Sequence, residues 1–370
     1  MSCFRPCLHL VSSILLVVLA LAMPARAEVT ATDILGRQVT LEQPARRIVL
    51  AEGRHMAILG ILHDDPVSLV VGWRLARSLD EPTMQAYREK FPAIDQIRPV
   101  GAGNRDLSVE AVIALKPDLV VISPVERGNP AADRAAATLE AAGIPLAYVD
   151  FYTNPLENTV PSLRILGKLT GAEDRAEAFI GFYQSRLDRI AERLKDPAIP
   201  RPRVFFHVHA APSGCCSTVG KGIFDDFIRA AGGQNIGAET IDAPTGTVGL
   251  EHLISADPDV YVATGGIHMI VRGGLVLGAG VDQETAQASF DKLVGARGFS
   301  GLRAVRDGRA VGVWQMFNDS PTHIALIEFL AKTLHPDLFA DLDPDATEAE
   351  LSQKFSPVQV PGMWWVTKKH

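Results

Sequence analysis

The side chains of this sequence that could bind a ligand gather where predicted buried strands end. In α/β folds, ligands bind in the crevice at the carboxyl ends of parallel strands. The candidates in the first third of the chain are Glu52, Arg54, His55, Trp73, Arg74 and Arg105. The candidates in the second half are His209, Cys215, Cys216, His268, Gln315, Phe317 and Asn318. The sequence therefore predicts a ligand site built from two separate parts of the chain.

Cations dominate the first group of candidates. Arginine presents planar, paired donors that suit carboxylate or catecholate oxygens. Trp73 could stack on a flat ligand, and it lies next to Arg74 in the sequence. These residue types indicate an anionic ligand rich in oxygen.

His207 and His209 offer a different chemistry. They lie two residues apart on a predicted strand, so their side chains should share a face and could hold a metal ion. Further ligands for zinc or manganese could come from Glu52, His55, His268 and Asp319. The sequence has no histidine-rich loop, and one histidine pair on a strand more often packs and forms hydrogen bonds. A bare-metal site is therefore the secondary interpretation.

The same histidines with a carboxylate base would also suit a periplasmic metallohydrolase. The sequence lacks a His-Glu-x-x-His motif, a Gly-x-Ser-x-Gly elbow and a phosphate-binding loop. We therefore expect a protein that is not an enzyme and that has no cofactor of its own.

Cys215 and Cys216 are the two cysteines left once a leader is removed. Thiols of exported proteins tend to oxidise, and these neighbours could form a vicinal disulfide that rigidifies their loop. A soft metal site and two free thiols are the alternatives. The pattern favours the disulfide.

The first 27 residues are typical of a cleaved signal peptide. Arg5 precedes an apolar run over residues 11–23, and Ala25-Arg26-Ala27 supplies the small residues that a signal peptidase needs. We expect cleavage before Glu28 and a periplasmic location. The net charge is −7, which disfavours nucleic acid as a partner.

The elements that must position the candidates alternate between short apolar strands and amphipathic helices. This order predicts two α/β lobes with mainly parallel sheets, as in Rossmann-like folds. Between them, residues 155–199 predict a long connecting helix, with apolar side chains spaced by three and four. The predicted divisions are 1–27 signal peptide, 28–154 first lobe, 155–199 connecting helix, 200–340 second lobe and 341–370 tail. The tail could add a strand or a cover, or be mobile.

One stretch occurs in both predicted lobes. Residues 107–121 return as residues 248–262, which sets Glu110 on Glu251 and aligns two Pro-Asp pairs at an offset of 141 residues. Each copy predicts a helix stopped by proline and followed by a buried strand.

These residues resemble the periplasmic substrate-binding proteins of ABC importers for ferric siderophores, haem and cobalamin. The resemblance rests on Ser108-Val109-Glu110 with Ala114 to Val120, on the turn Ala231 to Ile236, and on Leu250-Glu251 with Asp257-Pro258-Asp259. It covers nearly all of the chain after the leader.

The resemblance implies a fold, partners and a cargo. It implies two lobes joined by one long helix, with Glu110 and Glu251 at the outer tips, where they meet arginines of an ABC permease dimer that works with its ATPase. The cargo would be a small-molecule iron chelate, and a ferric siderophore suits the arginines better than cobalamin does. Haem is another option, with histidines as axial ligands. We expect a monomer.

Overall fold

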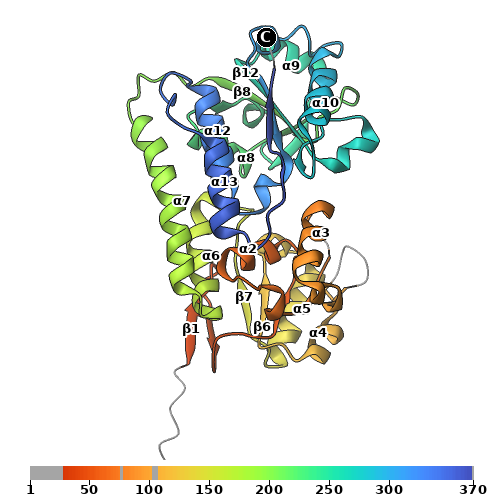
Figure 1. Cartoon of the computed structure of the whole chain (residues 1–370), viewed down its shortest axis with the longest axis vertical. Coiled ribbons are helices and arrows are strands. Elements are labelled where there is room, and N and C mark those ends of the chain that lie inside the picture. The colour runs from red at the N-terminus through yellow and green to blue at the C-terminus, as the bar shows by residue number, and fades with distance from the viewer. Residues whose placement is uncertain (1–27, 76–77, 102–106, 369–370) are drawn as a thin grey trace, which may run out of the picture.

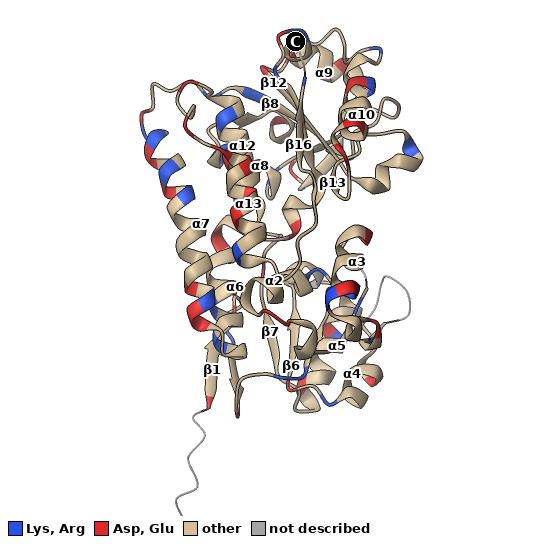
Figure 2. Cartoon of the chain, in the orientation of Figure 1, with Lys and Arg blue, Asp and Glu red and all other residues tan. Residues whose placement is uncertain are grey.

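The two predicted α/β lobes are present in the structure. The computed structural model describes residues 28–75, 78–101 and 107–368, so the predicted signal peptide lies outside the described residues. The lobes lie end to end, with a long helix along one side of the molecule (Figure 1). Lys, Arg, Asp and Glu lie mainly on helices and loops, while the central strands carry few charges (Figure 2). This distribution is what a buried parallel sheet requires.

The first lobe is built on a five-stranded parallel sheet in the order β5-β4-β3-β6-β7. Its strands are β3 (Ile48–Leu50), β4 (Val70–Trp73), β5 (Arg98–Pro99), β6 (Leu119–Ile122) and β7 (Leu146–Tyr148). Its helices are α2 (His55–Leu62), α3 (Glu81–Lys90), α4 (Val109–Leu115) and α5 (Pro130–Ala141). Apolar runs over residues 47–51, 67–71, 119–122 and 145–149 predict four of these strands, β3, β4, β6 and β7. The two-residue strand β5 has no such run.

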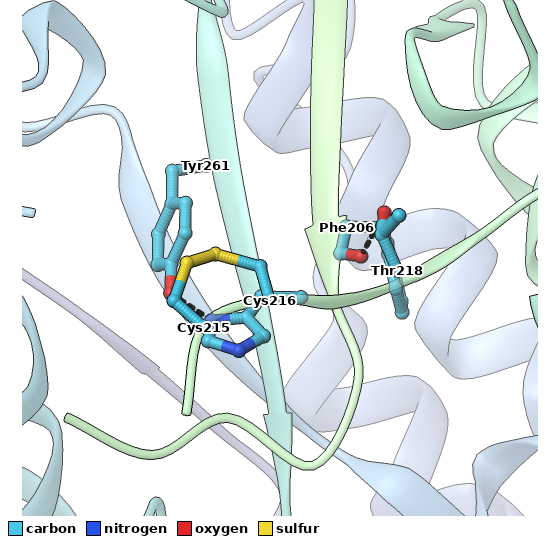
Figure 3. Close-up of a disulfide and its surroundings, with 6 residues drawn as sticks. Phe206, Cys215, Cys216, Thr218 and Tyr261 are labelled. Carbon is cyan, nitrogen blue, oxygen red and sulfur yellow. Dashed lines mark hydrogen bonds between the residues drawn. A yellow bond between two sulfur atoms is a disulfide. The ribbon is translucent and has the colours of Figure 1, made fainter. Parts of the chain in front are cut away.

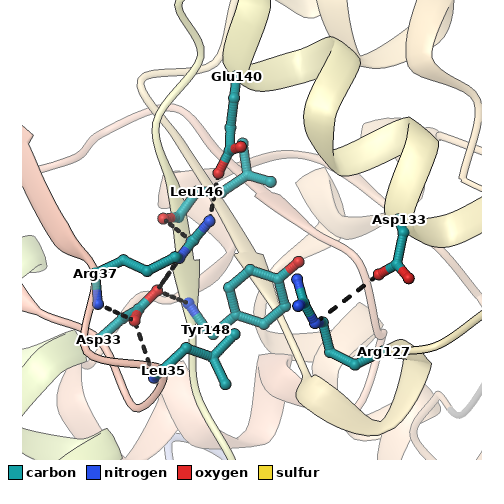
Figure 4. Close-up of polar contacts among 8 residues, drawn as sticks. All are labelled: Asp33, Leu35, Arg37, Arg127, Asp133, Glu140, Leu146 and Tyr148. Atoms are coloured by element: carbon teal, nitrogen blue, oxygen red, sulfur yellow. Dashed lines mark hydrogen bonds and ion pairs between the residues drawn. The ribbon is translucent and has the colours of Figure 1, made fainter.

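A hairpin of β1 (Val29–Thr32) and β2 (Gln38–Leu41) covers the edge of this sheet beside β7. The fully buried carboxylate of Asp33 accepts hydrogen bonds from the backbone N–H groups of Leu35, Arg37 and Tyr148 at 3.0, 3.0 and 3.2 Å. The same carboxylate accepts two bonds of 2.9 Å from the Arg37 guanidinium, which also contacts Glu140 (Figure 4). These bonds fix the hairpin on the sheet edge.

The connecting segment holds two helices. The long connecting helix is α7 (Glu173–Arg193), and it carries most of the predicted apolar stripe. The range predicted for it, 155–199, also contains α6 (Pro155–Thr170), which is a separate helix. Gly171 separates the two because it adopts a left-handed conformation, with φ of 71°, that ends α6.

The second lobe has a mixed sheet in the order β11-β9-β8-β12-β14-β16, with β10 paired to β8. Its strands through β14 are β8 (Arg203–His207), β9 (Ser217–Val219), β10 (Gln234–Asn235), β11 (Thr245–Thr247), β12 (Val260–Gly265) and β14 (Ala310–Trp314). Its helices are α8 (Phe224–Ala230), α9 (Leu250–Ala256), α10 (Gln283–Gly295), α11 (Arg303–Arg306) and α12 (His323–Leu334). The parallel strands β8, β12 and β14 form its centre.

The C-terminal tail belongs to both lobes. It forms α13 (Pro344–Phe355), β15 (Gly362–Met363) and β16 (Trp365–Thr367). β15 pairs with β13 (Gly278–Ala279), and β16 adds an antiparallel strand beside β14. α13 packs against α12 and also against α2 of the first lobe. The sequence left open whether the tail adds a strand, forms a cover or is mobile. In the structure it adds a strand, preceded by a helix that contacts both lobes.

The repeated stretch has the same structure in both lobes. α4 ends at Lys116 and α9 ends at Asp257, and both residues adopt the left-handed conformation, with φ of 48° and 40°. A buried proline follows each of them, and then the central strands β6 and β12 begin. The predicted repeat is therefore a structural repeat.

An arginine outside the aligned stretch extends this repeat. The Arg47 guanidinium donates to the carbonyl of Leu115 at 2.7 Å, and the Arg203 guanidinium donates to the carbonyl of Ala256 at 2.7 Å. Each arginine thus satisfies a carbonyl at the C-terminus of its repeated helix and complements the helix dipole. Asp118 and Asp259 complete the match, because each accepts the backbone N–H of its arginine, at 2.9 and 2.8 Å.

We predict that Asp33→Ala destabilises the protein by about 3 kcal/mol, because it leaves buried donors and a guanidinium without their acceptor. Glu140→Ala removes the exposed partner of the same arginine and should cost less than about 1 kcal/mol. Urea unfolding of both variants measures the difference. Equal losses of stability would contradict the role given to the buried carboxylate.

Candidate functional site

A buried ion-pair cluster joins the two lobes at the carboxyl ends of their strands. The Arg54 guanidinium, 5% exposed, contacts Glu52 at 2.7 Å and Asp319 of the second lobe at 2.8 Å. Tyr152 packs its ring 4.5 Å from the guanidinium carbon. A buried cation needs such partners, because desolvation costs several kcal/mol per ion. The crevice predicted to lie at the strand ends is therefore bridged by an interlobe contact.

Gly53 lies between Glu52 and Arg54, and sterics explain why this position is a glycine. A Cβ at Gly53 would lie 2.9 Å from the hydroxyl of Ser78 and 3.0 Å from the carbonyl of Arg74. The segment that follows β4 thus packs directly on the turn that carries Glu52 and Arg54. This close approach brings residues 78–80 to the cleft, although the sequence did not single them out.

The other predicted residues of the first lobe lie beneath the surface. His55, Trp73 and Arg74 are all buried, and Arg74 donates to the carbonyl of Ala51 at 2.7 Å. Arg105 lies outside the described residues. The cationic edge expected from the sequence is therefore largely internal, and Arg54 is balanced by two carboxylates.

The predicted metal pair His207 and His209 does not share a face. β8 ends at His207, whose buried ring accepts or donates a 2.7 Å hydrogen bond with the Tyr261 hydroxyl and stacks on Phe299. His209 lies beyond the strand with φ of 50°, in the left-handed region, and is exposed. The alternation of side chains along β8 stops before His209, so the rings of His207 and His209 do not lie on the same face.

His209 pairs instead with His268. Their ring nitrogens Nδ1 and Nε2 are 2.9 Å apart, and both side chains keep a solvent-exposed edge. Partial desolvation and the nearby Arg272 lower the pKa of both imidazoles, and His268 lowers that of His209 further, which favours the neutral form of each ring. A neutral pair of this kind can donate, accept or ligate a metal centre. The described residues contain no group of three or more potential metal ligands.

The vicinal disulfide expected from the sequence is present between Cys215 and Cys216 (Figure 3). It lies near Tyr261 and the β8–β12 pair (Figure 3). The backbone of Cys216 exchanges two hydrogen bonds with Val248, at 2.9 and 3.0 Å. The disulfide loop is thereby tied to the segment just before α9.

The remaining predicted residues lie in the turn after β14. Gln315 hydrogen-bonds through its side chain to Thr264, whose hydroxyl also accepts the backbone N–H of His209 at 3.0 Å. Through Thr264, Gln315 therefore helps to fix the backbone of His209, one of the two paired histidines. Phe317 and Asn318 are buried, and Phe317 stacks on Trp365 of the tail.

A cleft of about 500 Å³ lies between the lobes. Its lining includes residues 78–80 from the first lobe, and His268, Ile270, Trp314 and Met316 from the second. The volume is in the range of small-molecule sites. His268 is the one predicted site residue that lines this cleft directly.

Glu110 and Glu251 are exposed in the first turn of α4 and α9, and neither lines this cleft. One turn further along, Ile113 and Ile254 are 40% and 49% exposed, and they are again 141 residues apart. Each lobe therefore presents one carboxylate and one isoleucine at matching positions. The isoleucines were missed because an apolar residue on a helix is ordinarily assigned to the core.

We predict that acid destabilises the protein through its buried histidines. Burial lowers the pKa of His55 and of His207 to about 4. The unfolded chain binds these protons more tightly, so stability is full above about pH 6.5 and falls as the pH drops towards 4, by on the order of 3 kcal/mol per histidine. His207→Gln should reduce this dependence by close to one proton, measured as urea unfolding at pH 7 and 5. His252→Gln, on α9, is the control, and an unchanged pH dependence in His207→Gln would contradict the assignment.

Among the described residues, no helix combines the length and apolar character needed to cross a bilayer. The chain is similar to known proteins along most of its length. A relative in Halobacterium salinarum, named cobalamin-binding protein, is 28% identical over 239 residues, which are 63% of this chain and 58% of the relative. A Bacillus subtilis protein named uncharacterized ABC transporter substrate-binding lipoprotein YvrC is 26% identical over 265 residues, 70% of this chain and 73% of the relative.

The solved structure of a TroA-like periplasmic binding protein, FepB, from Veillonella parvula matches with a TM-score of 0.85 and 26% identity, over 92% of this chain and 100% of that one. Residues 68–313 match the family described as periplasmic binding protein. This match spans well over half of the chain, and the chain belongs to the periplasmic binding protein family.

Proposed function

We propose that this protein captures a metal chelate, foremost a ferric siderophore, in the periplasm and delivers it to an ABC permease dimer with its ATPase. The observation that carries the proposal is the pair of exposed carboxylates, Glu110 and Glu251, on structurally repeated helices of the two lobes. Two equivalent contacts suit a partner built from two equivalent halves. The leader predicted over residues 1–27 would direct the chain to the periplasm.

The donor groups of the cleft support a chelated metal rather than a bare ion. A bare zinc ion is usually held by three or four protein ligands. Within the described residues no three potential metal ligands lie together, and His209 and His268 form a pair with ring nitrogens 2.9 Å apart. A chelate brings most of its own ligands, so two imidazoles suffice to complete or orient it.

Cobalamin is the second candidate cargo, and two observations favour it. The Halobacterium relative is named for cobalamin binding. In addition, Glu52 and Asp319 balance the charge of Arg54, which weakens the sequence-based argument for a strongly anionic ligand. Cobalamin also offers a metal centre to the histidine pair, but its size would require a wider separation of the lobes.

We predict a one-to-one complex with one class of chelate. Native mass spectrometry of the mature chain against ferric hydroxamate, catecholate and carboxylate siderophores, haem, cyanocobalamin and Zn²⁺ identifies it. His268→Ala should weaken that complex at least tenfold, whereas His252→Ala, on the same lobe but on α9, should change it less than twofold. Retention of Zn²⁺ alone would argue for the bare-metal alternative.

We also predict that docking and capture separate genetically. Reversing both charges, with Glu110→Lys and Glu251→Lys, should leave chelate affinity unchanged and abolish stimulation of the importer's ATPase in proteoliposomes. Ile113→Ser with Ile254→Ser should reduce the stimulation in the same way, because each isoleucine lies one turn from a carboxylate. Val271→Ser, at an apolar residue that is 90% exposed outside the repeated helices, is the control. Full stimulation by the double glutamate variant would refute the docking role.

A further inference from the structure

A second, smaller cavity of about 160 Å³ adjoins the interlobe cleft. The two cavities share residues 78–80, Trp314 and Met316 as lining. This smaller cavity, which we call the side chamber, is therefore an extension of the cleft between the lobes.

The walls of the side chamber are mainly apolar and come from distant parts of the chain. α2 contributes Ile61, α7 contributes Phe179, and the tail contributes Leu351, Phe355, Val358 and Trp364. Both lobes and the tail thus meet around it. The charged residues Arg54, Asp80, Asp319 and Glu348 also line the side chamber. Its volume is comparable to that of an apolar cavity that binds benzene, so its apolar part suits one aromatic ring.

A polar group without a partner lies where the side chamber meets the cleft. The Ser78 hydroxyl is buried, and within the described part of the chain it has no hydrogen-bond partner. Ser78 lines both cavities. A buried hydroxyl left unsatisfied costs about 1–3 kcal/mol, so this position is ready to bond a polar atom of a ligand that enters from the cleft.

We propose that the side chamber binds one apolar group of about six or seven carbon atoms, such as an aromatic ring, carried by the chelate whose polar body fills the cleft. The assignment of this group to the cargo rests on the proposed function. The side chamber holds the ring among apolar side chains, and the Ser78 hydroxyl bonds the polar atom that links ring and chelate. The cargo is then a chelate with an aromatic or branched alkyl arm.

Two leucine variants on α13 isolate the side chamber. Ser352 lines it, so Ser352→Leu places new methyl groups inside. The neighbouring Gln353 is exposed and does not line it, so Gln353→Leu adds the same side chain elsewhere. Val360→Ala enlarges the side chamber and serves as a second variant if Ser352→Leu lowers the thermal midpoint.

The first probe is toluene, and its binding to the purified mature chain is measured by saturation-transfer NMR. We expect binding to the parent protein and to Gln353→Leu, and loss of binding to Ser352→Leu. Val360→Ala should admit naphthalene, which the parent excludes. Absence of toluene binding to the parent would overturn the proposal whether or not chelates bind.

The second probe is a pair of synthetic ferric tris-hydroxamates that differ in one N-benzyl group in place of N-methyl. The benzyl chelate should bind ten- to a hundredfold more tightly than the methyl chelate, since one buried ring is worth about that much. Ser352→Leu should remove this advantage, and Ser78→Ala should weaken the benzyl chelate alone. Equal affinities for both chelates would overturn the side chamber as a cargo site and leave chelate capture intact. If neither chelate binds while toluene does, chelate capture of this class fails and the side chamber remains a separate apolar site.

Discussion

The arrangement of the lobes depends on one buried charge. Arg54 is almost fully withdrawn from water, and carboxylates from both lobes hold it there. The attraction within a buried ion pair is largely offset by desolvation, so such a contact is strongly directional without being strongly stabilising. The lobes are therefore held in register by this buried contact, and removal of either carboxylate would leave the guanidinium only partly compensated. Ligand binding changes the separation of the lobes only to the extent that the ligand has a higher affinity for one separation than for another.

The two lobes share a supporting design for their outer helices. In each, an arginine at the start of a central strand donates to the last turn of the repeated helix, and an aspartate accepts the backbone of that arginine. The helix is thus attached at its C-terminus to a central strand of its lobe, β3 or β8. Its first turn, which carries the carboxylate, is left exposed. A short helix fixed in this way presents its carboxylate at a defined distance from the sheet. This arrangement occurs in both lobes.

The sequence predicted those features that depend on local pattern. Apolar runs located β3, β6, β7, β12 and β14, and the repeat located α4 and α9, because burial of a strand or of a helix face leaves a periodic trace. The errors arose where tertiary contacts decide. His209 leaves its strand through a left-handed residue, and its partner His268 is 59 positions away. The contact of Asp319 with Arg54 could not be found from the sequence, because 265 positions separate the two residues. The tail strand β16 was left open because its place in the sheet depends on pairing with β14, a tertiary contact.

The tail and β14 together place three indole rings at the junction of the lobes. Trp314 and Trp364 lie 4.9 Å apart between ring centroids, and Trp365 stacks on Phe317 and Phe329. Trp314 and Trp364 line the space where both lobes meet. The remaining tryptophan, Trp73, is buried at the end of β4. The chain thus contains its own optical reporter, because the ultraviolet emission of this indole cluster depends on the polarity and water content of the junction. A ligand that enters the junction would change this emission without any attached dye.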